Sequence, residues 1–443
     1  MSETFCNFAA ETIQPHFSMK KLYILLLFLP LFLSCAAQQP NQKPIVKTGI
    51  EVLRERHFDC LRGKRVGLCT NPTGVDHNLK STIDILHEAP EVNLVALFGP
   101  EHGVRGNIHA GDVIQSEVDP KTGITMYSLF GKYRKPTREM LDSIDVLVYD
   151  IQDIGCRSFT YISTLGNLME ACAEYDKELV VLDRPNPLGG EKIEGNCVEE
   201  GYYSFVSQFH IPYVYGQTCG ELALMLNEEG MQTAEPRARA AEGRGKCRLT
   251  VIPMQGWHRS MTWQDTGLPW VISSPHIPEP VTACFYPVTG IFGELGYFSI
   301  GVGYTLPFQL FAADWINADS LADAMNALSL PGLRFRPIHF NPYYAVGKGS
   351  TLRGVQIHIT DYSVARLSEV QFLLVQELMR LWPERDVFKY CNQQRFSMFD
   401  KVCGTDYIRT TFSQRYQWAD IRDYWYKDVE SYRRLSAKYY LYK

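Results

Sequence analysis

The sequence predicts an α/β protein built on a mostly parallel β-sheet. From Arg65 to Gly230, short apolar runs alternate with stretches of helical spacing, a pattern typical of parallel strands joined by helices. Glycine, proline or clustered polar residues follow the apolar runs, which is where strands end and loops begin. The chain has 443 residues, too many for one ordinary core, so we expect two domains.

Local patterns place the elements of the sheet domain. Strands are expected at 65–70, 94–98, 124–129, 146–149 and 179–182, and helices at 81–87, 137–144, 163–176 and 218–229. Ser163 is the expected N-cap of the third helix, and Gly230 closes the fourth.

A change of composition marks the second domain. After Pro253 the chain becomes rich in tryptophan and proline, as in a crossover between domains. Further on we expect a loop-like run at 290–308, a strand at 352–360, a helix at 368–381 and a C-terminal helix within 416–443. The expected boundaries are 47–268 for the sheet domain and 269–443 for a smaller α+β domain.

Residues 1–46 are expected to direct the chain to the cell envelope. Met19 precedes two lysines, and residues 22–33 are apolar but too short to span a bilayer. Leu33-Ser34-Cys35 resembles a bacterial lipobox, so Cys35 is the expected lipidation site, followed by a flexible tether. Secretion with cleavage near Ala36 is the alternative. No acidic run follows Cys35, and we therefore expect a lipid-anchored protein that faces the periplasm.

Polar side chains follow four of the expected strands. The clusters are Thr70-Asn71, Glu101-His102, Asp150 with Gln152 and Asp153, and Asp183-Arg184 with Asn186. In a parallel sheet the carboxyl ends of the strands share one edge, so these side chains would converge in one crevice. Each aspartate taken alone is explained equally well as a helix cap. Four clusters together predict a functional cleft.

The segment 97–106 concentrates this chemistry. An apolar run stops at a glycine and a proline, and Glu101, His102 and Arg105 follow. A partly desolvated carboxyl close to Phe98 suits a general acid, so Glu101 is the expected proton donor. The alternative is that Glu101 pairs with Arg105 or caps a helix.

Composition and missing motifs narrow the function. The net charge of −5 and the absence of a basic block argue against a nucleic-acid partner. The sequence contains no P-loop, no H-E-x-x-H and no G-x-S-x-G motif. A nucleotide-dependent enzyme is disfavoured because G-x-G-x-x-G is missing, although the layout is Rossmann-like. We expect no cofactor and no metal, since a polar loop explains His102, His109 and Asp112 more simply.

Several long motifs resemble the NamZ-type exo-β-N-acetylmuramidases, a glycoside hydrolase family. They are Phe98–Arg105, Val148–Arg157 with Tyr161, Leu182–Gly190, Gly67–Gly74, Gly216–Ala223 and Ser274–Pro278. The resemblance implies a Rossmann-like N-terminal domain, a smaller C-terminal domain and an active-site cleft between them. It also implies that the protein releases N-acetylmuramic acid (MurNAc) from the non-reducing end of peptidoglycan fragments.

The sequence departs from the family pattern at two positions. The segment from Glu294 to Thr305 keeps Glu294, Ser299 and the glycines, but Val302 stands where the family has an arginine. An arginine there could pair with the lactyl carboxylate of MurNAc, whereas valine cannot. His276 stands where asparagine is usual.

A glycosidase needs a proton donor and a second group that activates water or stabilises the transition state. Glu101 is the expected acid, and Asp153 and Glu294 are equal candidates for the second role. The 2-acetamido group of the sugar is an alternative nucleophile. Arg157 and Arg184 are expected to bind the substrate carboxylate, and His102 and Asn186 the hydroxyls. Further expected substrate contacts are Asn71, Arg105, Gln152, Tyr161, Asp183 and His276.

A different class of function fits the same residues. A lipid-anchored receptor that holds muropeptides without cleaving them would need the cleft but not the acid. Release of sugar from a β-MurNAc substrate separates the two hypotheses.

Overall fold

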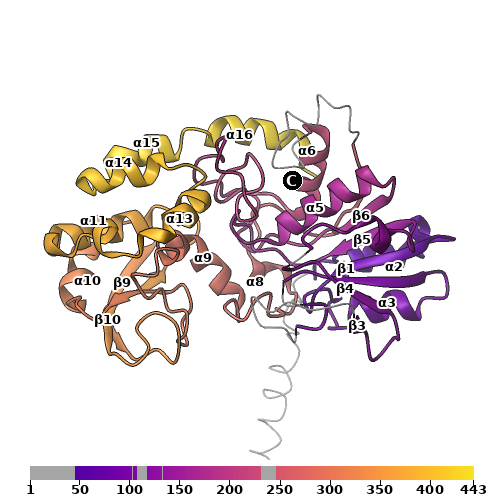
Figure 1. Ribbon diagram of the computed structural model, residues 1–443, viewed down its shortest axis with the longest axis horizontal. Coiled ribbons are helices and arrows are strands. Elements are labelled where there is room, and N and C mark those ends of the chain that lie inside the picture. The colour runs from indigo at the N-terminus through magenta and orange to yellow at the C-terminus, as the bar shows by residue number, and fades with distance from the viewer. Residues whose placement is uncertain (1–44, 102, 107–116, 132, 231–245) are drawn as a thin grey trace, which may run out of the picture. The chain divides into compact units, whose positions relative to one another are not determined.

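A twisted, mostly parallel sheet forms the N-terminal part of the protein (Figure 1). The structure, a computed structural model, describes residues 45–101, 103–106, 117–131, 133–230 and 246–443. Within these residues seven strands pair in the order β3-β4-β2-β1-β5-β6-β7. They are β1 (Arg65–Thr70), β2 (Asn93–Gly99), β3 (Glu117–Val118), β4 (Thr125–Ser128), β5 (Val146–Asp150), β6 (Glu178–Leu182) and β7 (Arg248–Ile252). Neighbouring strands are parallel except β3 and β4.

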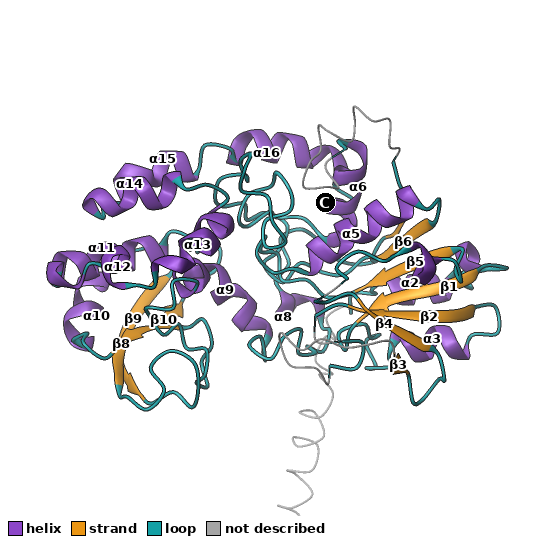
Figure 2. Cartoon of the chain, in the orientation of Figure 1, coloured by secondary structure: helices purple, strands orange, loops and turns teal. Residues whose placement is uncertain are grey.

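Helices pack on both faces of this sheet because its strands are apolar on both sides (Figure 2). Along β5, Leu147 and Tyr149 belong to one core, whereas Val146 and Val148 belong to another, as the two-residue period of a strand requires. The first core is covered by α4 (Arg138–Leu141), α5 (Tyr161–Glu174) and α6 (Cys219–Glu228), and the second by α2 (Gly49–Glu55) and α3 (Thr82–Glu88).

A smaller antiparallel sheet and a group of helices form the C-terminal part. The sheet has the order β8-β10-β9, with β8 (Leu310–Ala313), β9 (Leu333–Phe340) and β10 (Leu352–Ile359). The longer helices are α9 (Pro280–Gly293), α10 (Ala318–Ala327), α11 (Val370–Leu381), α13 (Phe396–Cys403), α14 (Tyr407–Arg415), α15 (Trp418–Trp425) and α16 (Val429–Ser436). The short helices are η1 (Asp59–Leu61), α8 (Trp263–Thr266), η2 (Pro383–Arg385), α12 (Val387–Tyr390), η3 (Gln393–Arg395) and η4 (Ala437–Tyr439).

The helix α9 contains a proline, and a buried glutamine supports the backbone around it. Pro280 begins the helix and Pro287 lies inside it, where a proline removes one N–H donor and crowds the preceding turn. The side-chain amide of Gln371, from α11, donates to the Pro287 carbonyl over 3.0 Å. Its oxygen accepts from the N–H groups of Ile291, at 2.9 Å, and Phe292, at 3.2 Å. Gln371 therefore holds the last turn of α9 in place.

The C-terminal segment returns to the edge of the N-terminal sheet. Val429 and Tyr432 of α16 pack into the core beneath α6. The hydroxyl of Tyr442 donates to Asp183, directly after β6, over 2.6 Å, and the N–H of Leu441 donates to Glu221 over 2.9 Å. The two sheets are thus joined both by α9 and by this returning segment.

The predicted α/β fold with a smaller C-terminal domain is confirmed, and three local predictions are wrong. Ser163 is not an N-cap, because α5 begins at Tyr161 and buries Ser163. The run 290–308 begins as the end of α9, which continues past Pro287 to Gly293. The tail is not one helix. It divides into α15 and α16, separated at Tyr426.

Several predictions lie outside what the structure describes. Residues 1–44, with Cys35, and the side chain of His102 belong to this group, and the domain boundary at 268 stays a prediction. Among the described helices, none is long and apolar enough to span a lipid bilayer. Ten cysteines of the described residues are free thiols.

We expect Gln371→Leu to destabilise the protein, because it leaves backbone groups of α9 buried without partners. The expected loss is about 3 kcal/mol of unfolding free energy, measured by urea denaturation. Gln264→Leu, at an exposed position in α8, is the control and is expected to change stability by less than about 0.5 kcal/mol. Equal stability of the two variants would contradict the role given to Gln371.

Candidate active site

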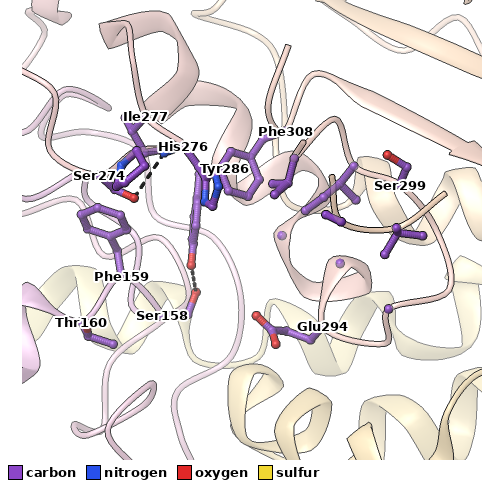
Figure 3. A pocket seen from close by; sticks show the side chains of 18 of the residues that line it. Ser158, Phe159, Thr160, Ser274, His276, Ile277, Tyr286, Glu294, Ser299 and Phe308 are labelled. Carbon is purple, nitrogen blue, oxygen red and sulfur yellow. Dashed lines mark hydrogen bonds between the residues drawn. The ribbon is translucent and has the colours of Figure 1, made fainter. Parts of the chain in front are cut away.

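A cavity of about 770 Å³ lies between the N-terminal sheet and α9 (Figure 3). Its lining comes from the loop after β2, the start of α5, the segment 274–277, the end of α9 and the loop that follows α9. Its polar residues are Glu101, Ser158, Thr160, Tyr161, Ser274, His276, Tyr286, Glu294, Ser299 and Arg395. Two carboxyls from distant parts of the sequence, Glu101 and Glu294, therefore face one space.

The sheet topology places Glu101 at this cavity. The strands β2, β1 and β5 are parallel neighbours, so their carboxyl ends lie at the same edge. After β2 the chain turns at once, and the N–H of Gly103 donates to the Pro100 carbonyl over 2.9 Å. Gly103 has a φ of +71°, a conformation that favours glycine. Glu101 lies in this turn and is partly buried.

Glu294 is the C-cap residue of α9 and lies opposite the sheet edge. Its backbone carbonyl accepts from Nε of Arg395. Its carboxylate lies 3.7 Å from Nη2 of the same arginine, and its side chain is 34% exposed. Burial raises the pKa of Glu294, and the positive charge of Arg395 partly opposes this rise. In Figure 3 the Glu294 carboxylate points from the helix end toward Ser158.

Asp153 is buried just behind the cavity and does not line it. Its Oδ2 accepts from the Tyr215 hydroxyl at 2.5 Å and from the Gly155 N–H at 2.7 Å, whereas Oδ1 has no partner among the described residues. Burial raises the pKa of Asp153 to about 7, against the lowering effect of these hydrogen bonds.

Two tyrosines lie close enough to Asp153 and to the cavity carboxyls for their pKa values to be affected by these charges. Burial raises the pKa of Tyr161, and the charges of Glu101 and Asp153 raise it further. Burial likewise raises the pKa of Tyr286, with smaller contributions from Glu294 and Asp153. All three predicted catalytic carboxyls therefore lie around these two phenols, but only Glu101 and Glu294 reach the cavity.

The two arginines predicted to bind a substrate carboxylate are occupied elsewhere. Arg157 is fully buried, and its guanidinium donates to the carbonyls of Asn196, Ile211 and Val402 over 2.6–2.9 Å. Arg184 is buried and pairs with Asp150, with N–O distances of 2.5 and 3.0 Å. Neither lines the cavity, so the structure corrects this prediction and gives both a structural role.

Other residues predicted to contact the substrate form hydrogen bonds within the protein instead, and these bonds hold the loops at the sheet edge in place. Asn186 bonds Gln217 and Leu188, and Asn71 accepts from Thr73. Gln152 donates to Pro185, and Asp183 accepts from Thr218 and Gly220.

Arg105 forms a bidentate pair with Asp119. Arg105 therefore does not pair with Glu101. Tyr161 and His276 do line the cavity, and Nε2 of His276 lies 3.0 Å from the Tyr344 hydroxyl.

The predicted site residues do not include several polar residues of the cavity, among them Ser158, Tyr286 and Arg395. Ser158 and Tyr286 meet across it, with their hydroxyls 3.2 Å apart, and Arg395 arrives from η3. None of them stands in a motif that marks it, and Arg395 is brought in by tertiary packing alone. Among the described residues, no group of His, Cys, Asp and Glu is arranged to hold a metal ion.

Two carboxyls from separate elements face one cavity beside aromatic rings. Glycoside hydrolases typically have such a pair of carboxyls in the active site. The family comparison agrees. Residues 66–281 match the N-terminal domain model of the exo-β-N-acetylmuramidase NamZ, and residues 284–442 match its C-terminal domain model. The chain belongs to the NamZ family of glycoside hydrolases.

Individual relatives support this assignment. The chain is 40% identical over 404 residues to the peptidoglycan β-N-acetylmuramidase NamZ of Bacillus subtilis (strain 168), covering 91% of this chain and 93% of the relative. A crystal structure of a DUF1343 family protein from Bacteroides fragilis NCTC 9343 matches with a TM-score of 0.84 and 63% identity, over 90% of this chain and 99% of that chain. A second such protein from the same organism matches with a TM-score of 0.69 and 29% identity, over the same shares.

The raised pKa of Asp153 predicts a pH dependence of stability. Between the unfolded value near 4 and the folded value of about 7, the folded protein binds the extra proton, so stability decreases as pH rises through this range. We expect Asp153→Asn to remove roughly 2–4 kcal/mol of this decrease, measured by urea denaturation between pH 4 and 8. Asp145→Asn is the control. Arg65 lowers the pKa of Asp145 to about 2, so this carboxyl titrates below the measured range and the variant should leave the decrease between pH 4 and 8 unchanged.

Proposed function

We propose that this protein cleaves peptidoglycan fragments from the non-reducing end and releases MurNAc, with Glu101 and Glu294 as its catalytic carboxyls. The placement of these two side chains on one cavity carries the assignment of roles. Membership of the family indicates glycoside hydrolysis as the reaction. The Bacillus subtilis relative is a peptidoglycan β-N-acetylmuramidase, which supports peptidoglycan as the substrate and MurNAc as the released sugar.

Glu101 acts as the proton donor to the leaving glycosidic oxygen, and Glu294 either activates water or stabilises the oxocarbenium-like transition state. Glu294 is preferred over Asp153 for the second role because Asp153 does not reach the cavity and holds Tyr215 and Gly155. If the substrate's own 2-acetamido group is the nucleophile, Glu294 is still placed to orient or stabilise it.

Aromatic side chains give this cavity a wall suited to the apolar face of a sugar. Phe159, Tyr286 and Phe308 form a connected row, with ring centroids 5.7 and 4.8 Å apart, and all three line the cavity. Such rings bury the C–H face of a pyranose, while the paired hydroxyls of Ser158 and Tyr286 offer hydrogen bonds. The hydroxyl of Tyr161 already donates to the Ser273 carbonyl.

Two glutamine variants separate the two catalytic roles. We expect Glu101→Gln to reduce kcat on the disaccharide MurNAc-GlcNAc by about 10²- to 10⁴-fold. On 2,4-dinitrophenyl β-MurNAc the same variant should lose far less activity, because this leaving group departs without a proton. Glu294→Gln should lose activity on both substrates.

The control is Glu279→Gln, an exposed carboxyl before α9 that does not line the cavity and should retain wild-type activity. Thermal unfolding checks that all variants are folded. Near-normal turnover by Glu101→Gln removes Glu101 from the mechanism. Binding of the disaccharide by the wild type without release of MurNAc supports the receptor hypothesis instead.

We further propose that the protein is anchored in the bacterial envelope by a lipid on Cys35 and faces the periplasm. The lipobox-like sequence supports this, as does a substrate that is produced in the envelope. The residues between Cys35 and Val46, where the described fold begins to pack, leave a tether between the membrane and the enzyme.

The anchor is tested by Cys35→Ser in the native host. We expect the wild type to incorporate labelled palmitate and to sediment with membranes, and the variant to do neither while its MurNAc release stays unchanged. Labelling of the variant, or a soluble and unlabelled wild type, would contradict lipidation at Cys35.

A further inference from the structure

The proposed substrate carries a negative charge that the reaction does not alter, and the cavity needs a group to recognise it. MurNAc differs from N-acetylglucosamine by a lactyl ether, whose carboxylate is ionised at neutral pH. A carboxylate that leaves water requires a positive partner. Among the described residues that line the cavity, Arg395 is the one lysine or arginine.

The other arginines near the sheet edge cannot serve this purpose. Arg157 and Arg184 are buried and committed to backbone carbonyls and to Asp150. Arg105 is committed to Asp119 through two hydrogen bonds of 2.9 Å. Val302, which also lines the cavity, is apolar and offers no charge.

The Nε atom of Arg395 is held by a hydrogen bond, whereas its two terminal nitrogens can still donate to a ligand. Its Nε donates to the Glu294 carbonyl, which fixes the plane of the guanidinium. Its Nη2 lies 3.7 Å from the Glu294 carboxylate, beyond hydrogen-bond distance, and its side chain is 46% exposed. A planar guanidinium held in this way can offer two parallel donors to a second carboxylate.

Gly296 lies beside this arginine in the loop between α9 and β8. Its φ is +62°, a conformation that favours glycine, and a Cβ atom there would make ordinary van der Waals contact, at 3.4 Å, with Cδ and Nε of Arg395.

We infer that Arg395 is the residue that recognises the lactyl carboxylate of MurNAc. This inference rests on the proposed function and adds the residue that selects the sugar. Arg395 also contacts Glu294, so a purely positioning role is the explanation that the experiment must separate.

The test compares two aryl glycosides that differ in one charge. 4-Nitrophenyl β-MurNAc and its lactyl methyl ester have the same ring and the same leaving group. We expect the wild type to have a higher kcat/KM for the acid, and Arg395→Gln to lose roughly 10- to 100-fold on the acid but little on the ester. Arg395→Lys should retain part of the preference for the acid, since lysine keeps the positive charge but lacks the two parallel N–H donors of a guanidinium.

Arg385→Gln is the matched control. Arg385 is a nearby exposed arginine whose guanidinium lies over Trp315 and does not line the cavity. The control should keep the wild-type preference for the acid.

Equal losses on acid and ester in Arg395→Gln would overturn the inference and leave Arg395 as a positioning residue for Glu294. The inference is also overturned if the wild type has the same kcat/KM for the acid and the ester. If the wild type releases nitrophenol from neither compound and no MurNAc from the disaccharide, the proposed function fails, which is a separate result.

Discussion

The last turn of α9 depends on the buried amide of Gln371, and the active site depends on that turn. Pro287 lies inside the helix, three residues before the cavity-lining Gly290. The glutamine bonds the Pro287 carbonyl and the N–H groups of Ile291 and Phe292. These bonds connect the turn that leads to Glu294 with α11 in the C-terminal core. A single buried side chain thus helps to fix the helix end that carries one of the two cavity carboxyls.

The opposite side of the cavity is made rigid in a different way. At the carboxyl edge of the sheet, most polar side chains bond the backbone of neighbouring loops, as Arg157 and Asn186 do. Buried polar groups that bond one another restrict the conformation of the loops that carry them. Some atoms of these groups, such as Nε of Arg157 and Oδ1 of Asp153, have no partner among the described residues. Burial at this edge raises the pKa of Asp153 to about 7.

The sequence predicts most of the sheet domain because strands such as β1, β2, β5 and β6 have a strong local pattern. It does not predict α2, β3 or β7. It places Glu101 directly after β2, where the side chain lines the cavity, but it does not predict which other polar residues face that space. Arg184 and Arg395 are equally charged, but whether a guanidinium meets Asp150 or the cavity is decided by packing between distant elements. The helix α9 was not predicted either, since a proline inside a helix is unusual.

Residues 429–442 complete the N-terminal sheet domain although they follow the whole C-terminal domain in the chain. Tyr442 reaches Asp183 and Leu441 reaches Glu221, and the end of the chain lies near α5 and α6 (Figure 1). In any vectorial process that begins at the N-terminus, the first domain therefore appears long before its own last supporting segment. The surface beneath α16 stays uncovered until residues 429–442 have followed, so the sheet domain is complete only when the whole chain is present.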